Sequence, residues 1–218
     1  MNLSANIARI RDVIEKNASG GLQAVTIVAV TKTRPPQEIN KLKEHGIIDI
    51  GENRVQEWLR KKDEIDPAYR LHHIGQLQTN KVKYLMGHTW LIQSVDRLSL
   101  LAEISRRSIS PTAVLLQVNT ARESSKAGAL PEDLPKLFDE AMKSVNISLK
   151  GLMCMAPLDG GKEAAGEAFT AAKQLFDEYS SIASSPEFST LSMGMSGDYD
   201  IALRCGANMI RIGSTLFI

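Results

Sequence analysis

The feature that most constrains the fold is a repeated alternation between short apolar segments and longer amphipathic segments. The apolar segments contain many β-branched residues and few charges, which is typical of strands buried on both faces of a sheet. We expect strands over residues 25–33, 47–50, 71–75, 90–95, 112–119, 147–155, 190–195 and 208–212. Helical patterns precede and separate them over residues 1–17, 36–44, 55–59, 79–86, 96–106, 162–182 and 201–205, with a further helix opening at Pro131 and a last turn from Ser214.

Eight strands that alternate with helices along one chain predict a (β/α)8 TIM barrel, with the helix of residues 1–17 as an N-terminal addition. An open, doubly wound sheet is the competing architecture. It would normally carry a glycine-rich phosphate turn after its first strand, and the turn after Lys32 contains no glycine. At 218 residues the chain is near the lower end of the size range of such barrels, so we expect residues 1–218 to form a single domain.

The composition and net charge of the chain argue against some classes of binding partner. Lysine and arginine total 26 against 25 aspartate and glutamate residues, with no basic block, so nucleic acids and anionic membranes are poor candidates. The N-terminal segment lacks the apolar core of a signal peptide, and no apolar run is long enough to span a bilayer. The two cysteines, Cys154 and Cys205, are typical of reduced core residues. These features indicate a soluble cytoplasmic protein.

A single lysine, Lys32, stands at the carboxyl end of the first expected strand. The pleat of a strand puts it on the same side as Val28 and Val30. One interpretation is a lysine that extends its ammonium group to water at the end of the strand. The other is a Schiff-base lysine, whose amine loses its proton easily in a dry, apolar pocket. The choice depends on which other side chains gather at the same end of the barrel.

In this fold the loops after the strands build the site, at the C-terminal mouth of the barrel. Barrels often hold a phosphate with the loops after strands seven and eight, which here are residues 194–198 and 213–215. Their small residues let backbone N–H groups approach an anion, and hydroxyl groups add donors. A pair of ordinary tight turns is the alternative interpretation. The residues expected at the mouth are Lys32, Glu52, Asn53, His73, Gly75, Ser94, Asn119, Pro157, Ser196, Gly197, Arg211, Gly213, Ser214 and Thr215.

Two strands carry a charge or an imidazole that needs a partner. Arg211 interrupts the last apolar strand, and its guanidinium needs an acceptor because it stays protonated. That acceptor is either the carboxylate of Asp198 or Glu52, or an aromatic ring nitrogen of a ligand. His72 and His73 are adjacent on a strand, so one of them must face the barrel interior. The four histidines show no metal-binding spacing.

Segments along almost the whole chain match a known family. They are AVTKT at 29–33, GENRVQEW at 51–58, HHIGQLQTNK at 72–81, SVDR at 94–97, QVNTARESSKAG at 117–128, GLMCMAP at 151–157, LSMGMSGDYDIAL at 191–203 and IRIGSTLFI at 210–218. The chain resembles the pyridoxal phosphate homeostasis proteins, whose fold looks like the N-terminal barrel of alanine racemase. The family usually has Trp-His-Phe-Ile-Gly where residues 71–75 of this chain read Leu-His-His-Ile-Gly.

The resemblance implies that Lys32 carries pyridoxal 5′-phosphate (PLP) as an aldimine. It also implies that the last two loops hold the phosphate, that Arg211 faces the pyridine nitrogen and that Asn53 lies near the ring. The cofactor-binding residues that we expect are Lys32, Asn53, His73, Ser94, Ser196, Gly197, Arg211, Gly213, Ser214 and Thr215, with no catalytic residue and no metal ligand.

The position implied for Arg211 bears on activity. A guanidinium facing the pyridine nitrogen disfavours protonation of that nitrogen, and an unprotonated ring is a weaker electron sink. Racemisation also needs a second acid or base on the opposite face of the substrate, and this chain has no sequence left for the further domain that supplies it in racemases. We therefore expect a monomer that holds PLP and passes it to PLP-dependent apo-enzymes without robust turnover. The alternatives are a small PLP-dependent amino-acid racemase that uses Lys32 as a base, and a barrel that binds a sugar phosphate.

Overall fold

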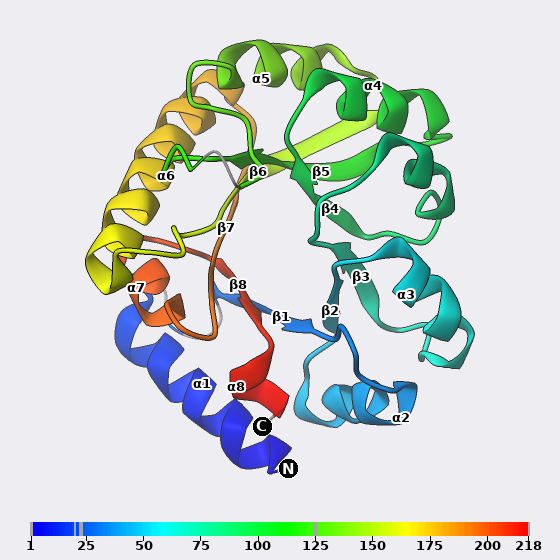
Figure 1. Ribbon diagram of the computed structural model, residues 1–218, viewed down its shortest axis with the longest axis vertical. Helices are drawn as coiled ribbons and strands as arrows, with labels where there is room; N and C mark the ends of the chain where they lie inside the picture. The colour runs from blue at the N-terminus through cyan, green and yellow to red at the C-terminus, as the bar shows by residue number, and fades with distance from the viewer. Residues whose placement is uncertain (1, 20, 22–23, 124–125, 218) are drawn as a thin grey trace.

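The structure, a computed structural model, describes residues 2–19, 21, 24–123 and 126–217 (Figure 1). In these residues eight parallel strands follow one another around a closed barrel, and β8 pairs with β1 to close it. The predicted (β/α)8 barrel is confirmed. The strands are β1 Thr26–Val30, β2 Asp49–Glu52, β3 Arg70–His73, β4 Leu91–Val95, β5 Thr112–Val118, β6 Ile147–Cys154, β7 Thr190–Met195 and β8 Met209–Ile212.

Helices connect the strands and surround the barrel (Figure 1). The α-helices are α1 Leu3–Asn17, α2 Pro36–Ile39, α3 Val55–Lys61, α4 Leu98–Arg107, α5 Leu134–Lys143, α6 Gly161–Ala183, α7 Tyr199–Arg204 and α8 Ser214–Phe217, and the 3-10 helices are η2 Asn40–His45, η3 Lys62–Glu64 and η4 Thr79–Tyr84. The connection between β3 and β4 is thus a 3-10 helix instead of the expected α-helix, a form that is frequent in short connectors. α5 begins at Leu134 instead of Pro131, and the proline in its first turn is Pro135.

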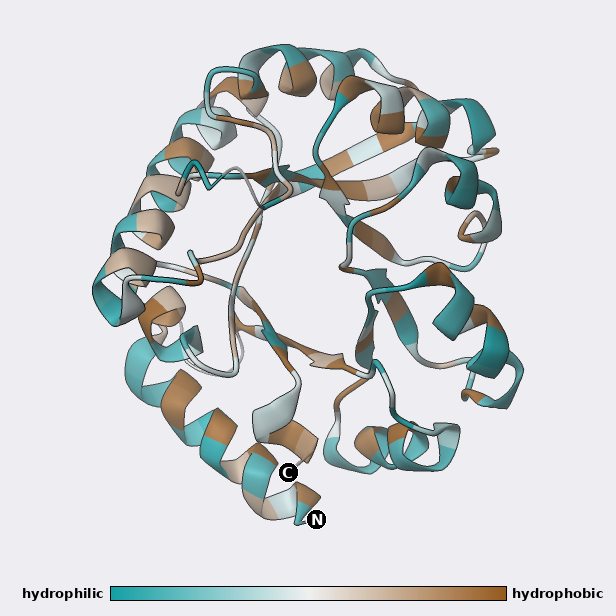
Figure 2. Ribbon diagram, viewed as in Figure 1, coloured by the Kyte–Doolittle hydropathy of each residue, from teal (hydrophilic) through white to brown (hydrophobic). Residues whose placement is uncertain are grey.

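Alternation along the strands creates two apolar regions. One set of residues points into the barrel, where Val28, Leu91, Leu115, Met153 and Met209 form a cluster. The residues between them point outward and pack against the helices in a larger core. Figure 2 shows α1 striped with hydrophobic and hydrophilic residues, as expected for a helix with one side on the strands and the other in water.

The two ends of the described chain lie side by side where the barrel closes (Figure 1). β1 and β8 pair in parallel, and α1 packs against α7 and α8. The Asn2 side chain caps α1 by accepting the N–H of Ala5 (3.1 Å). The buried Asn6 side chain donates to the Leu216 carbonyl (3.1 Å), which ties α1 to α8 across the seam between β1 and β8. The added N-terminal helix is therefore part of the barrel wall.

None of the helices in the described residues is long and apolar enough to cross a membrane. In the same residues, histidine, cysteine, aspartate and glutamate side chains are nowhere grouped in threes that could hold a metal ion. Cys154 and Cys205 are free thiols, and burial raises the pKa of Cys154.

Candidate functional site

Lys32 lies in a solvent-exposed turn at the C-terminal mouth. β1 ends at Val30, and the buried Thr31 is the last residue held against the sheet, through its N–H to the Gly51 carbonyl (3.0 Å). The chain then leaves the barrel, and Thr33 adopts the left-handed backbone conformation with a φ of 65°. Of the two interpretations of Lys32, its exposure fits the ammonium group that extends to water, and the dry, apolar surroundings of the other are not found because the strand stops before it.

A buried ion pair fixes the backbone next to Lys32. Glu52 at the end of β2 and Lys61 in the last turn of α3 approach to 2.6 Å, and only 1% and 8% of their side chains are exposed. The Lys61 ammonium also donates to the Thr31 carbonyl (2.9 Å), and the Thr31 hydroxyl donates to Glu52. Burial raises the pKa of Glu52, against the opposing effect of the hydrogen bonds from Lys61 and Thr31. The residue before Lys32 is thus anchored from two elements, while the Lys32 side chain stays outside.

The lysines near the mouth differ in whether they already have partners. Lys61 is held in the ion pair just described. Lys126, in the loop after β5, donates to the Ala156 carbonyl and pairs with Glu123 (3.2 Å). In contrast, the Lys32 ammonium makes no hydrogen bond or ion pair within the described residues. Lys32 is therefore the amine that a ligand can use without breaking an existing contact.

The loops after β7 and β8 meet at one hydroxyl group. The Ser196 hydroxyl oxygen accepts the backbone N–H groups of Gly213 (3.2 Å) and Thr215 (3.3 Å). The Thr215 hydroxyl donates in turn to the Ser196 carbonyl (3.3 Å). A Cβ atom at Gly213 would lie 3.4 Å from the Cβ of Val30, so the loop packs against the end of β1. Backbone donors and hydroxyls therefore converge beside the strand that leads to Lys32, an arrangement suited to an anion.

The other residues of these two loops are either exposed to solvent or form hydrogen bonds within their own loop. Gly197 and Ser214 are exposed, and a Cβ atom at Gly197 would meet no described atom within 4 Å. The Asp198 carboxylate accepts the N–H of Met195 (2.6 Å), and burial raises its pKa. Asp198 therefore stabilises the turn after β7.

Arg211 is buried inside the barrel, with 3% of its surface exposed. Its guanidinium donates to the Ser192 hydroxyl (2.7 Å) and to the Cys154 carbonyl (2.9 Å). Burial lowers the pKa of Arg211 to about 10, against smaller opposing effects of Cys154 and Asp198. Neither Asp198 nor Glu52 forms an ion pair with it in the described residues. A buried cation with only neutral partners is costly, which favours a ligand that offers a further acceptor.

The two adjacent histidines lie on opposite faces of β3. His72 pairs with Gly51, whose Cβ position lies 3.0 Å from Val28 in the barrel interior, and His72 is therefore the inner residue. His73 points outward, where it lines a cavity of about 270 Å³ together with Leu77 and other residues of the loops after β2 and β3. The expected place of His73 beside a ligand inside the barrel is thus wrong for this arrangement, because the alternation of the strand assigns that side to its neighbour.

His73 is the more unusual of the two in its surroundings. It is buried, and neither of its ring nitrogens has a hydrogen-bond partner among the described residues. Burial lowers the pKa of His73 to about 4, with a smaller opposing effect of the Gly75 backbone. The imidazole is therefore neutral in the folded protein near pH 7.

Asn53 and Ser94 lie at or near the ends of β2 and β4. Asn53 is half-buried, and Gly75 packs so closely against it that a Cβ atom there would lie 2.2 Å from the Asn53 carbonyl oxygen. Ser94 is buried, and its hydroxyl group has no hydrogen-bond partner among the described residues. A buried hydroxyl without a partner is rare in proteins and is typical of places where a polar ligand or water binds.

Inside the barrel lies a line of polar residues, of which sequence reasoning named only His72, as one of two histidines that could face inward. The line consists of Asp49, His72, Gln93 and Ser192, all buried. Gln93 lies two positions after the inward Leu91, and His72 pairs across from the inward-facing Gly51. Alternation groups them with the inward residues once the structure has shown which face of each strand is inward, since side chains two positions apart lie on the same face.

Comparison with known proteins assigns the chain to a family. The sequence matches the family described as alanine racemase, N-terminal domain, over residues 1–218. It is 37% identical over 228 residues to the pyridoxal phosphate homeostasis protein of Aquifex aeolicus (strain VF5), which covers 100% of this chain and 98% of that protein. The chain belongs to the pyridoxal phosphate homeostasis protein family. The member from Deinococcus radiodurans is 38% identical over 221 residues, or 100% of both proteins.

Structural comparison agrees with this family assignment. PipY of Synechococcus elongatus PCC7942, in a structure with PLP bound, superimposes with a TM-score of 0.87 at 30% identity, over 99% of this chain and 100% of that chain. The resemblance noted in segments such as GENRVQEW at 51–58 is thus confirmed as family membership. The match extends over the whole chain and so includes the loops that carry Lys32 and Ser196.

Proposed function

We propose that this protein binds PLP through Lys32 and takes part in the homeostasis of that cofactor, as one barrel domain over residues 1–218. The observation that carries the proposal is the Lys32 amine, which has no partner within the described residues and follows a strand that packs against the loop of Gly213. The PLP-bound structure of PipY supports the choice of ligand. The unpaired thiols of Cys154 and Cys205 support a reducing, cytoplasmic location.

The residues present suit the separate parts of PLP. The loops after β7 and β8 bring backbone N–H groups and hydroxyls together around Ser196, and the proposed phosphate ligands are Ser196, Gly197, Gly213, Ser214 and Thr215. Arg211 offers a donor to the pyridine nitrogen, and Asn53 and Ser94 offer neutral polar groups to the ring. His72 replaces His73 in this proposal, because it is the histidine that faces the interior.

Lys32 provides the covalent attachment. PLP supplies an aldehyde and an electron-withdrawing ring. With PLP bound, the Lys32 Nζ would hold its aldehyde carbon covalently, and the neutral amine would supply both N–H hydrogens of the water that is lost. Because Lys32 is exposed, water also has access to the same bond for the reverse reaction. Release to a PLP-dependent apo-enzyme then needs no opening of the barrel.

Arg211 supports binding over turnover. A guanidinium that stays protonated disfavours a second positive charge on a ring nitrogen beside it, and the buried surroundings strengthen this effect. The ring then withdraws electrons less strongly, and carbanion chemistry at an amino acid is slowed. We therefore propose a binding protein without robust catalytic turnover.

Absorbance and reduction test the proposal directly. The purified protein with added PLP should absorb in the visible range, and borohydride should fix the cofactor on Lys32, as identified by peptide mass spectrometry. Lys32→Ala should abolish this labelling while the circular dichroism of the barrel is retained. Lys126→Ala is the matched control, since it removes another lysine of the mouth, and it should keep the label on Lys32. Labelling at Lys126, or none at any lysine, would refute the proposal.

Hydrogen exchange separates this function from the racemase alternative. The PLP-loaded protein should leave the α-hydrogen of alanine almost unexchanged in deuterated water. Exchange at enzymatic rates that disappears in Lys32→Ala would show a small racemase-like enzyme instead. A protein that binds a sugar phosphate but never takes up PLP would support the third alternative.

A further inference from the structure

A continuous chain of hydrogen bonds runs through the barrel from Arg211 towards the opposite end. Arg211 donates to the Ser192 hydroxyl (2.7 Å), which lies 2.6 Å from the side-chain oxygen of Gln93. The side-chain nitrogen of Gln93 lies 2.9 Å from Nδ1 of His72, and Nε2 of His72 lies 2.8 Å from the Asp49 carboxylate. All five side chains are buried, and each comes from a different strand. We call this chain the relay.

The two ends of the relay and the orientation of the Gln93 amide together set the direction of its hydrogen bonds. A guanidinium only donates, so Ser192 accepts from Arg211 and points its own proton at Gln93. The Gln93 oxygen is then the acceptor, and its nitrogen must donate to Nδ1 of His72. His72 therefore carries its proton on Nε2 and donates it to Asp49, which as a carboxylate only accepts. With the Gln93 oxygen towards Ser192, each member of the relay therefore has one role.

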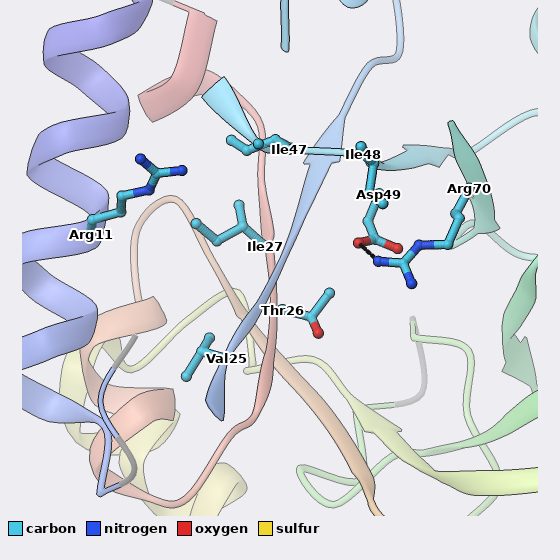
Figure 3. Close-up of a pocket in the computed structure, with 9 residues that line it drawn as sticks. Arg11, Val25, Thr26, Ile27, Ile47, Ile48, Asp49 and Arg70 are labelled. Carbon is cyan, nitrogen blue, oxygen red and sulfur yellow. Dashed lines mark hydrogen bonds and ion pairs between the residues drawn. The ribbon is translucent and has the colours of Figure 1, made fainter. Parts of the chain in front are cut away.

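Asp49, the last residue of the relay, lies at the N-terminal end of the barrel. Asp49 accepts a second hydrogen bond from Arg70 (2.5 Å), and both line a cavity of about 300 Å³ at the beginnings of β1, β2 and β3 (Figure 3). The Arg70 guanidinium also lies over the ring of Trp90, 5.3 Å from its centre. The carboxylate is thus anchored by a cation on the solvent side and is held in place for His72 on the inner side.

We propose that Asp49, His72 and Gln93, acting through Ser192, are positioning residues that hold Arg211 in place for the pyridine nitrogen of PLP. The inference rests on the proposed function, because it assigns these side chains a role that acts through Arg211. Arg211 forms no ion pair in the described residues, so its orientation depends on these neutral contacts and on the Cys154 carbonyl. Losing one link frees the guanidinium to turn, and it leaves the neighbouring polar groups without partners.

Gln93→Leu is the informative variant, because it removes both contacts at the middle of the relay with little change in side-chain volume. Loss of a well-held hydrogen bond to a charged group corresponds to a factor of about ten, and we expect release of PLP to be about tenfold faster. Ser192→Ala should have a similar effect, and the double variant should be no worse than either single one, since both break the same chain. Gln117→Leu is the matched control: Gln117 is a buried strand glutamine whose side-chain nitrogen bonds the Ala127 carbonyl (2.7 Å) outside the relay.

Nuclear magnetic resonance supplies readouts that a merely structural role would not move. In the protein without PLP, the ring nitrogens of His72 should show the proton on Nε2, and Gln93→Leu should alter the Nδ1 signal. In the loaded protein, ¹⁵N-labelled PLP should show a shift of the pyridine nitrogen in Gln93→Leu and Ser192→Ala but not in Gln117→Leu. The wild-type measurement on His72 stays decisive even where a variant fails to fold.

The outcomes distinguish this inference from the proposed function. A wild-type protein that takes no PLP on Lys32 overturns both. Uptake on Lys32 with release rates and pyridine shifts that are equal in Gln93→Leu and Gln117→Leu overturns the relay alone. A proton on Nδ1 of His72 in the wild-type protein also overturns it, because the direction of the hydrogen bonds would then be different.

Discussion

Replacing His73 by phenylalanine should stabilise the protein and remove part of its sensitivity to acid. His73 is buried on the outer side of β3, and both of its ring nitrogens lack hydrogen-bond partners in the described residues. Phenylalanine has a ring of similar shape and no polar atom to desolvate.

The magnitude follows from the pKa of the imidazole. Burial lowers the pKa of His73 from an ordinary 6.5 to about 4. Between these two values the unfolded chain binds a proton that the folded chain does not, so the free energy of unfolding falls as the pH is lowered. The full stability is present above pH 6.5, and about 3 kcal/mol is lost by pH 4, at roughly 1.4 kcal/mol per pH unit.

At pH 7 the imidazole is mainly neutral in the folded and the unfolded protein. The effect of His73→Phe at this pH therefore comes from the buried ring nitrogens that lack hydrogen bonds. Unsatisfied buried polar atoms cost about 1–3 kcal/mol, so His73→Phe should raise the free energy of unfolding by about 1 kcal/mol or more at this pH. At pH 5 the gain should be about 2 kcal/mol larger than at pH 7, since the wild-type protein also loses stability to proton binding in its unfolded state.

Urea denaturation followed by circular dichroism, at intervals between pH 4.5 and pH 7.5, measures both energies. The difference between wild type and His73→Phe isolates this one group from other titrating residues. His88→Phe is the control, because it makes the same change at an exposed position and should leave the slope of the curve unchanged. Parallel curves for wild type and His73→Phe would refute the reasoning.

Three further changes test other parts of the structure. Ser196→Ala should speed the loss of PLP about tenfold, as measured by dilution, while leaving the visible absorbance maximum nearly unchanged, since it removes one hydrogen-bonding group from the anion loops only. Lys61→Met leaves Glu52 buried without its cation and should lower the free energy of unfolding by about 3–5 kcal/mol in urea, and adding Glu52→Gln should recover part of this loss. Gly75→Ala places a Cβ atom 2.2 Å from the Asn53 carbonyl oxygen, so it should lower the melting temperature and weaken PLP binding together.

The barrel itself could be predicted from residue patterns, because a strand buried on both faces leaves a distinctive run of apolar residues. The segment at 112–118 is one example, and the structure has a strand at that place. Helix type was harder to predict, as the connection Thr79–Tyr84 shows, because a 3-10 helix and an α-helix share most of their local signals. The loops after β7 and β8 were predictable as a pair because this architecture brings them together.

The exposure of Lys32 could not be predicted in the same way. It depends on where β1 leaves the sheet, and that point is set by contacts of Thr31 with Gly51 and Lys61, which are distant in sequence. Which of His72 and His73 faces the barrel interior also could not be predicted from the sequence. The alternation of a strand is visible in a sequence, but which face is inward is known only once a neighbouring strand supplies a register.

The loops after β7, β8 and β1 flank the seam along which the barrel closes. A ligand joined to Lys32 on one side and to Ser196 on the other spans that seam, so it recognises only a chain whose last strand has reached its first. PLP would then bind only the closed barrel, so its binding free energy would stabilise the closed barrel and not a partly formed one. Binding of the cofactor should therefore raise the free energy of unfolding of the closed barrel.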